Sequence, residues 1–259
     1  MKKLKMKLFF DHVCGQQANT DFIHTLVSAT FLDSEQDMAL ENGWCPSNIW
    51  YSANTNFKKN NKIIWYQSRQ SRINLSKYKK SKSERRLRKK IFDYNINYKL
   101  TKFPNFDLLY DIYRKYVKHK QYKDYMSKKS FLESYSNSND FFIVYDDIAF
   151  SVVEICSKSL ISHQFCWDYK NPDLSLGKFS TYIEIDFALN NNLQNVYLGP
   201  SYESNSIYKS HFRGFEFWTG RKWSSDKEAF KYLLDKDCKL NSINEITKEY
   251  ENYFSLLSV

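Results

Sequence analysis

The pattern of apolar and polar positions changes from a helical period to a strand period near the middle of the chain. Between residues 107 and 125, apolar side chains recur every three or four positions, with lysine and arginine between them. This spacing predicts an amphipathic helix. The residues that set the period are Leu108, Leu109, Ile112, Tyr113, Tyr116 and Val117. A second, shorter helix is expected at about residues 128–135.

Three strand-like runs follow this helical region. They occupy residues 141–145, 148–155 and 160–167, and short polar turns separate them. Their Val, Ile and Phe side chains suit a pleated, half-buried surface. Successive runs of this length joined by short turns predict a meander of antiparallel strands.

The apolar pattern between residues 182 and 189 fits both the strand period and the helical period. Its apolar residues alternate as in a strand, and they also pair at i,i+4 as in a helix. Thr181 and Glu184 have the spacing of a capping box, which favours a helix. A strand at residues 196–198 is expected next. Three antiparallel strands, a helix and a strand form the order of a GNAT-like acyltransferase core, so the expected fold class is α+β.

The first 76 residues predict a smaller α/β subdomain. The subdomain should contain a helix, because one helical face fits the spacing of Phe22, Leu26, Val27 and Phe31. Apolar runs at residues 49–51 and 63–66 predict a hairpin, with the Asn-rich residues 54–61 as its long loop. We therefore expect two domains, an N-terminal subdomain at residues 1–76 and a GNAT-like transferase domain at residues 77–259.

Composition and charge indicate a globular protein with a polyanionic partner. Hydrophobic residues make up 42% of the chain and aromatic residues 18%, which predicts an aromatic-rich core. The net charge of +10 and the pI near 9.1 suit a nucleic acid or an anionic surface. The most basic segment, residues 77–90, is expected to form a phosphate-binding helix, and a solvated helix without a ligand is the alternative.

Cysteine usage indicates a reducing compartment, so a cytoplasmic location is expected. The cysteines are odd in number and scattered, without metal-ligand spacing, which predicts free thiols and no metal site. They are Cys14, Cys45, Cys156, Cys166 and Cys238. The apolar run in the basic N-terminus is too short for a signal peptide, and no window approaches the roughly 18 apolar residues of a membrane span.

Residues 173–213 carry the motifs of a known family. The segment Asp173–Ser180 (DLSLGKFS) precedes the expected helix, Tyr197-Leu198-Gly199 forms the next strand, and Tyr208-Lys209 stands just before Phe212-Arg213. This order resembles the loop, helix, "YLG" strand and Y-K-x-x-F element of arginyl-tRNA–protein transferases and their bacterial leucyl-transferring relatives. These enzymes act at protein N-termini.

Upstream motifs keep the order of that family. Gly43-Trp44 resembles the start of its "GWRR" element, residues 81–86 resemble its basic "SKSQRR" helix, and residues 109–119 resemble its "LY…Y…H" helix. The resemblance covers about residues 10–223. The family's cysteine-rich N-terminal elements are reduced here to Cys14 and Cys45, so no iron–sulfur centre is expected and the acceptor specificity cannot be transferred.

The resemblance implies a metal-independent aminoacyltransferase that uses aminoacyl-tRNA as co-substrate and needs no cofactor. It would form an amide bond with an acceptor amine on a protein N-terminus, a peptide or a small molecule, with no membrane partner. The residues expected to bind tRNA phosphates are Lys77, Lys79, Lys80, Lys82, Arg85, Arg86, Arg88, Lys89 and Arg213.

An aminoacyl ester is already activated, so such an enzyme has to align the amine, accept its proton and stabilise the oxyanion. The candidates for catalytic roles are Asp173, Glu184, Asp186 and Tyr197, and the carboxylates have surface or capping roles as alternatives. The residues expected at the aminoacyl end are Leu198, Gly199, Tyr208 and Lys209. For the last two, the alternative is a tyrosine in the core and a lysine in solvent.

Two other functions remain open. An acyl-CoA-dependent GNAT N-acyltransferase would need a glycine-rich pyrophosphate loop, and residues 174–180 contain one glycine. A catalytically silent tRNA-binding protein would bind tRNA whether or not it is charged.

Overall fold

The structure is a computed structural model that divides into two compact units. It describes residues 7–17, 20–46, 50–59, 62–67, 69–122, 125–135, 140–201, 204–219 and 222–237. Unit 1 comprises Met1–Arg72 and Gly199–Val259, and unit 2 comprises Ile73–Leu198. The predicted domains, 1–76 and 77–259, do not coincide with these units, because residues 199–259 group with the N-terminal segment.

Unit 2 contains the predicted meander. Strands β6 (Tyr98–Thr101), β7 (Asp140–Tyr145), β8 (Ala149–Ile155) and β9 (Ser159–Trp167) pair antiparallel in that order. Helix α5 (Leu176–Asn190) leads from β9 to β10 (Asn195–Ser201), which pairs with β9 in parallel. The α+β class and the predicted order of three strands, a helix and a strand are therefore confirmed.

The other helices of unit 2 also lie close to their predicted positions. They are α2 (Lys82–Asp93), α3 (Phe106–His119) and α4 (Lys128–Tyr135). The periodicity predicted a helix up to residue 125, but α3 ends at His119, since Gln121 adopts a left-handed φ of 56°. Such a conformation ends a helix.

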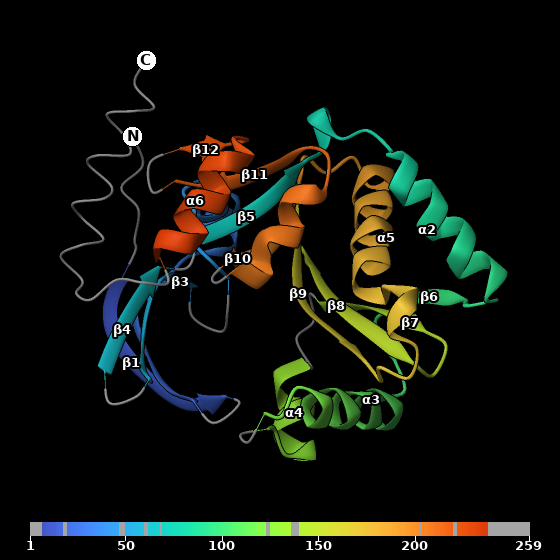
Figure 1. Ribbon diagram of the computed structural model, residues 1–259, viewed down its shortest axis with the longest axis horizontal. Helices are drawn as coiled ribbons and strands as arrows, with labels where there is room; N and C mark the ends of the chain where they lie inside the picture. The colour runs from blue at the N-terminus through green and yellow to red at the C-terminus, as the bar shows by residue number, and fades with distance from the viewer. Residues whose placement is uncertain are drawn as a thin grey trace. The chain divides into compact units, whose positions relative to one another are not determined.

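The sheet of unit 2 is covered on both faces by these helices. Helix α5 packs against one face of β8 and β9, and α3 packs against the other, with α4 beside it (Figure 1). Because side chains alternate along a strand, each strand contributes to both layers. On β8, for example, Ser151 points to α5 while Phe150 and Val152 point to the α3 side.

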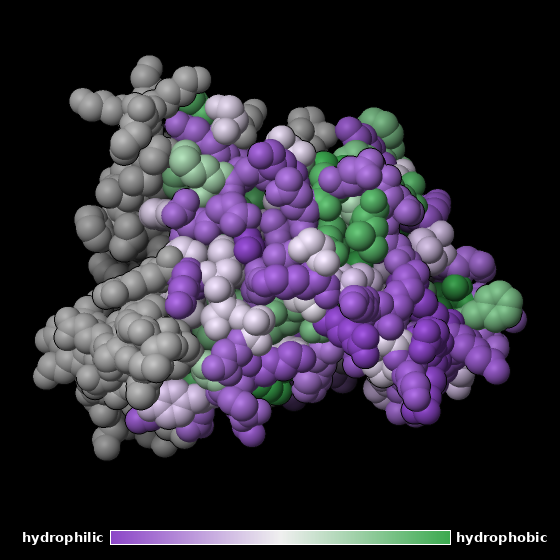
Figure 2. Space-filling view, turned by 90° about the horizontal axis from the view of Figure 1, so that it is seen from above, coloured by the Kyte–Doolittle hydropathy of each residue, from purple (hydrophilic) through white to green (hydrophobic). Residues whose placement is uncertain are grey.

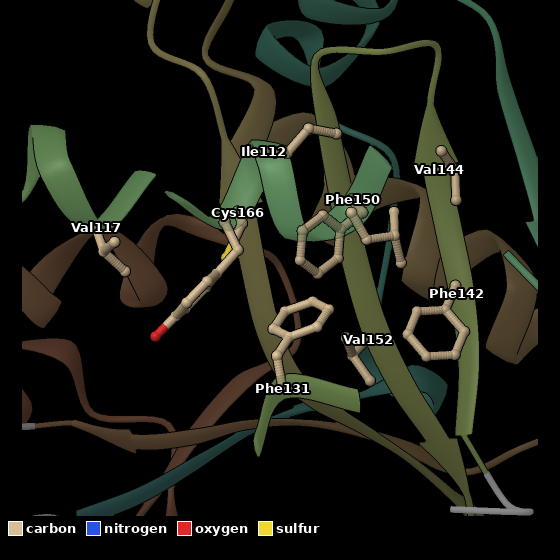
Figure 3. Close-up of a cluster of buried hydrophobic side chains, with 10 residues drawn as sticks. Ile112, Val117, Phe131, Phe142, Val144, Phe150, Val152 and Cys166 are labelled. Atoms are coloured by element: carbon tan, nitrogen blue, oxygen red, sulfur yellow. The ribbon is translucent and has the colours of Figure 1, made fainter. Parts of the chain in front are cut away.

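The layer between α3, α4 and the sheet is an aromatic core (Figure 3). Phe131 of α4 is fully buried, and its ring contacts those of Tyr113 and Phe150 at centroid distances of 5.2 and 6.2 Å. Phe142 and Cys166 complete the strand side of the cluster. The predicted aromatic-rich core is therefore present in this unit.

A capping box occurs at α2 rather than at α5. Ser81 accepts a hydrogen bond from the backbone N–H of Glu84 at 3.0 Å, and Glu84 accepts one from the N–H of Ser81 at 3.3 Å. The box predicted at Thr181 and Glu184 is wrong, because α5 begins at Leu176 and both residues lie inside the helix. Its N-cap is Ser175, with a φ of 50° and no side-chain cap.

Unit 1 contains a four-stranded antiparallel sheet in the order β1-β2-β3-β4. Its strands are β1 (Lys7–Gln17), β2 (Thr20–Thr30), β3 (Trp50–Lys59) and β4 (Lys62–Gln67). The other elements of this unit are α1 (Gln36–Glu41), β5 (Arg69–Asn74, which ends in unit 2), β11 (Phe215–Trp218), β12 (Trp223–Ser224) and α6 (Lys227–Asp237).

Two predictions for this segment are corrected. The helix proposed from Phe22 to Phe31 is wrong, because these residues form β2, whose backbone pairs with β1 and β3. The segment is rich in Thr, Ile and Val, and β-branched residues favour strands. The hairpin is confirmed, but its Asn-rich loop is not, since β3 continues to Lys59, which pairs with Lys62.

Hydrophilic residues predominate on the face of the described surface seen in Figure 2. In the part of the chain that the structure describes, no helix has the length and apolar character to cross a membrane. Cys45, Cys156 and Cys166 are buried free thiols, as expected, whereas Cys238 lies outside the described residues.

Truncation of the central core ring provides a test of this packing. We expect Phe131→Ala to lower the free energy of unfolding by about 3–5 kcal/mol, because a fully buried ring leaves a cavity among well-packed neighbours. Urea denaturation followed by fluorescence measures the change. Phe103, which is 90% exposed, is the matched control, and Phe103→Ala should change stability by less than about 0.5 kcal/mol. Equal effects of the two variants would contradict the assigned core.

Candidate functional site

The end of β10 and the buried Lys209 form the first part of the candidate site, within unit 1. Lys209 donates hydrogen bonds from Nζ to the carbonyl oxygens of Gly199 at 3.2 Å and Pro200 at 2.9 Å. The Gly199 carbonyl also accepts a hydrogen bond from Ser71 Oγ at 3.0 Å. Two donors therefore fix the orientation of this peptide group at the point where β10 enters unit 1.

Gly199 has a conformation and surroundings that leave room beside the strand. Its φ is +72°, a left-handed value that glycine adopts without the penalty of a Cβ atom. A Cβ placed on it would meet no described atom within 4 Å. The glycine is therefore needed for the backbone turn, and the described residues leave open space next to its Cα atom.

The environment of Lys209 lowers the pKa of its ammonium group. Burial is the main cause and brings the pKa to about 8, while the nearby Cys45 acts in the opposite direction. Burial also raises the pKa of the Cys45 thiol to about 12, with Lys209 lowering it slightly. At neutral pH the pair is thus a neutral thiol beside a lysine that is mostly protonated, with carbonyl oxygens as its hydrogen-bond partners.

The neighbouring site candidates on these segments differ in exposure. Tyr208 is 49% exposed, whereas Lys209 is 7% exposed, so the alternative of a tyrosine in the core and a lysine in solvent is wrong. Tyr197 is fully buried in β10, and Leu198 is half-buried. Of these residues, the structure joins Gly199 and Lys209 by a direct hydrogen bond.

A second set of polar side chains is buried under α5 in unit 2. Glu184 accepts a hydrogen bond from Ser151 at 2.5 Å and one from Ser180 at 3.3 Å, both at Oε1. Ser180 in turn accepts a hydrogen bond from Tyr145 at 2.9 Å. Among the described residues, Glu184 Oε2 has no hydrogen-bond partner. These contacts join the helix to β7 and β8 through a chain of hydroxyl groups.

Burial raises the pKa of the Glu184 carboxyl to about 7, and the surrounding serine hydroxyls offset only part of this shift. The residue is 1% exposed. Glu184 therefore gains or loses its proton near neutral pH in the interior of unit 2. There, a negative charge interacts more strongly with neighbouring groups than it would in water.

The other two candidate carboxylates lie at the surface of unit 2. Asp186 forms ion pairs with Arg88 at 2.8 Å and Lys80 at 3.4 Å. Asp173 is exposed, and its backbone carbonyl accepts a hydrogen bond from Lys90 Nζ at 2.7 Å. The basic segment is thus anchored to α5 and to the turn before it.

Helix α2 and the residues before it present the predicted basic surface. Exposed cations on this segment are Lys77, Lys79, Lys80, Lys82, Arg85, Arg86 and Lys89. Arg88 differs, because it pairs with Glu84 and Asp186 and donates a hydrogen bond to the Tyr182 carbonyl. Its charge is compensated within the unit. Arg213, the remaining predicted phosphate ligand, is exposed in unit 1.

Two polar clusters were not found from the sequence. Arg72 donates to Glu216 and Glu41, each at 2.8 Å, and lies 4.1 Å from the centre of the Trp223 ring. In unit 2, Asp140, Glu154 and His163 bring potential metal-ligand atoms within 4.8 Å of one another. The sequence signal of the second cluster was weak, since its members are 9 to 23 positions apart and no motif links them.

The buried Glu184 predicts a pH dependence of stability. Its folded-state pKa of about 7 lies above the ordinary value near 4.5, so the native state holds more protons between these pH values and stability falls as pH rises through this window. In Glu184→Gln this loss should be absent. The unfolding free energy of the variant relative to the wild type should thus increase by up to about 3 kcal/mol from pH 4.5 to 8.

Denaturant unfolding at several pH values measures this difference. Glu133→Gln on the exposed face of α4 controls for the removal of one carboxyl group. A difference between Glu184→Gln and wild type that stays constant over the range would show that Glu184 does not titrate near pH 7.

Comparison with known proteins adds independent information on this arrangement. Residues 105–219 match the model of the family described as arginine-tRNA-protein transferase, C terminus. The matched span includes α3, the meander, α5, β10, Gly199 and Lys209. A search of curated proteins found no match.

Solved structures include two similar chains. The C-terminal domain of a putative lysylphosphatidylglycerol synthetase from Agrobacterium fabrum is 12% identical, with a TM-score of 0.44, over 55% of this chain and 49% of that one. This chain thus spans about half the length of that structure. A structure titled L-PGS from Bacillus licheniformis is 8% identical, with a TM-score of 0.44, over 88% of this chain and 90% of that one.

The family match and the motif order agree in their position on the chain. Both include the loop before α5, the Tyr197-Leu198-Gly199 strand and the Tyr208-Lys209 pair. Residues 105–219 are therefore similar to the C-terminal part of arginine-tRNA-protein transferases.

Proposed function

We propose that the protein transfers an aminoacyl group from aminoacyl-tRNA to an acceptor amine and forms an amide bond. The observation that carries this proposal is the family match over residues 105–219. That span contains the Gly199 turn and the buried Lys209 that holds it. The acceptor is a protein N-terminus, a peptide or a small amine, and the reaction needs neither a cofactor nor a metal.

The open space beside Gly199 is the proposed position of the aminoacyl end. The ester bond to tRNA is already activated, so the protein has to hold the ester and the amine in contact and to stabilise the charge that develops on the carbonyl oxygen. Lys209 acts as a positioning residue, since its ammonium group fixes the Gly199 and Pro200 carbonyls. Its positive charge also favours negative charge nearby.

The acceptor amine has to lose a proton during attack, and the candidate carboxylates differ in their access to it. Glu184 is buried, as is the candidate Tyr197, and Asp186 is paired with Arg88 and Lys80. Asp173 is exposed at the turn before α5. An amine has a reference pKa near 8, so a solvent-accessible carboxylate or a water chain suffices to accept its proton. Of the candidate carboxylates, Asp173 is the exposed one, and water is the alternative proton acceptor.

The exposed cations of α2 are the proposed contact surface for tRNA phosphates. Together with those just before the helix, seven exposed cations lie on one continuous segment, from Lys77 to Lys89, and Lys80 among them pairs with Asp186. Phosphate contacts of this kind give affinity that falls with salt and carry little sequence information. Recognition of the amino acid is thus left to the β10 region.

A discharge assay tests the reaction. Purified protein is incubated with a pool of radiolabelled aminoacyl-tRNAs and with proteins, peptides or small amines as acceptors. We expect label to move to an acceptor in a step that ribonuclease treatment of the tRNA prevents. Lys209→Met should lower the single-turnover rate at least about tenfold while tRNA affinity changes less than about twofold, because the positioning charge is lost.

Lys231→Met on the exposed face of α6 is the matched control for loss of one lysine, and circular dichroism confirms folding of both variants. Tight tRNA binding without discharge would instead identify a silent tRNA-binding protein. Transfer from acetyl-CoA in a parallel reaction, with none from tRNA, would identify a CoA-dependent acyltransferase. Either result would overturn the proposal.

Charge reversal on α2 tests the tRNA surface. Arg85→Glu/Arg86→Glu should weaken binding of all tRNAs to a similar extent and lower the slope of log affinity against log salt by about 1 to 2. Lys227→Glu/Lys231→Glu on α6 makes the same change in net charge elsewhere on the surface and should have a smaller effect. Equal losses in the two double variants would show that net charge, rather than α2, governs binding.

A further inference from the structure

Three polar side chains meet where the aromatic core of unit 2 ends. Asp140 begins β7 and pairs in register with Glu154 of β8, and the next strand, β9, contributes His163. The three strands lie side by side (Figure 1). His163 Nε2 is 2.8 Å from Glu154 Oε2. The potential ligand atoms of all three residues lie within 4.8 Å of one another.

A bulge brings the histidine into this group. The pairing of β8 with β9 shifts between Val152 and Val153, whose partners are Gln164 and Ser162, so His163 is the extra residue. A bulge redirects a side chain that regular alternation would place on the other face. It thereby allows His163 to reach Glu154, which lies on the same face as Phe150 and Val152.

The position of Asp140 is the second observation. On β7 it continues the row of Phe142 and Val144, which face the aromatic core, and it is only 6% exposed. One of its carboxyl oxygens lies within 4.8 Å of the potential ligand atoms of Glu154 and His163. A buried carboxylate beside a second carboxylate is costly without a compensating cation.

We propose that Asp140, Glu154 and His163 bind one divalent transition-metal ion, with Zn²⁺ as the best match. An imidazole nitrogen with two carboxylate oxygens suits Zn²⁺ or Mn²⁺, whereas Mg²⁺ and Ca²⁺ prefer oxygen ligands alone. Three protein ligands leave a coordination position for water on the partly exposed side of His163. The ion would supply the positive charge that the two carboxylates lack.

The geometry requires only small adjustments. Zinc binds nitrogen and oxygen ligands at about 2.0–2.2 Å, so two ligands of a tetrahedral ion are about 3.4 Å apart. The most distant pair of ligand atoms here is no more than 4.8 Å apart. Rotation of the partly exposed His163 ring and of a carboxylate would bring these atoms toward this spacing.

This site is separate from the proposed transfer reaction. Glu154 and Asp140 lie on the face of the sheet that meets α3 and α4, whereas Glu184 lies on the α5 face. Lys209 belongs to the other unit. The ion would link β7, β8 and β9. Because it would bind the folded state and not the unfolded chain, it would stabilise the protein.

Zinc titration of the full-length, chelator-treated protein tests the site. We expect isothermal titration calorimetry to show one equivalent of bound Zn²⁺ per chain, and Asp140→Asn and His163→Gln should each abolish this binding. Zn²⁺ should raise the melting temperature by several degrees only in proteins that retain the site. Glu133→Gln and His211→Gln are the matched controls, since both residues are exposed, and they should keep the equivalent.

Two measurements keep the result interpretable. Melting curves without metal show whether each variant folds, and Asp140→Asn should fold because it removes a buried charge. The absorption spectrum of the Co²⁺ form should lack the thiolate charge-transfer band that cysteine ligands give. An unchanged Zn²⁺ equivalent in both folded site variants, no Zn²⁺ binding by the wild type, or a thiolate band lost with neither variant would each overturn the proposal.

Discussion

Side-chain alternation along β7, β8 and β9 is the constraint on which the arrangement of unit 2 depends. Each residue of these buried strands has to face either α5 or the α3 and α4 layer. Phe142, Phe150 and Val152 take one side and form the aromatic core, and Tyr145 and Ser151 take the other. A one-residue shift of any strand would exchange these sets and leave polar groups in the aromatic layer.

The same constraint explains why charged groups are buried in this protein. A polar residue on either face of these strands is buried because the strand is buried. It then needs a hydrogen-bond or ion-pair partner from the helix that covers that face or from an adjacent strand. Glu184 finds hydroxyl partners on β8 and on its own helix, and Glu154 finds an imidazole on β9. In unit 1, Lys209 finds two backbone carbonyls of β10. Each group therefore depends on backbone placement by the fold, and each is held more rigidly than a surface side chain would be.

This dependence decides what the sequence could predict. Periodicity located α3, α4 and the meander, because their apolar residues repeat at the spacing of the element itself. Periodicity failed between Phe22 and Phe31, because the i,i+4 spacing predicts a helix whereas the β-branched residues favour a strand. The segment forms strand β2, which pairs with β1 and β3. The sequence pattern also misplaced the capping box, since Thr181 and Glu184 have the correct spacing but lie within α5, and Ser81 and Glu84 have the same spacing at a true helix start. The clusters at Lys209 and at Asp140 depend on contacts between distant strands, which spacing along the chain does not encode.

Two kinds of cation among the described residues would suit different steps of the proposed reaction with aminoacyl-tRNA. Those of α2 are exposed, and they can follow a phosphate backbone without fixing its register. Lys209 is buried and bonded to the strand at which the ester would lie, so its position is set before any substrate arrives. Affinity from an exposed basic surface raises the bound fraction but does not favour the transition state over the ground state. A fixed charge beside the reacting carbonyl would do so because no reorganisation is required. In the proposed reaction, the basic surface of α2 would serve tRNA capture and the buried Lys209 would serve acyl transfer, so the acceptor could change without altering tRNA capture.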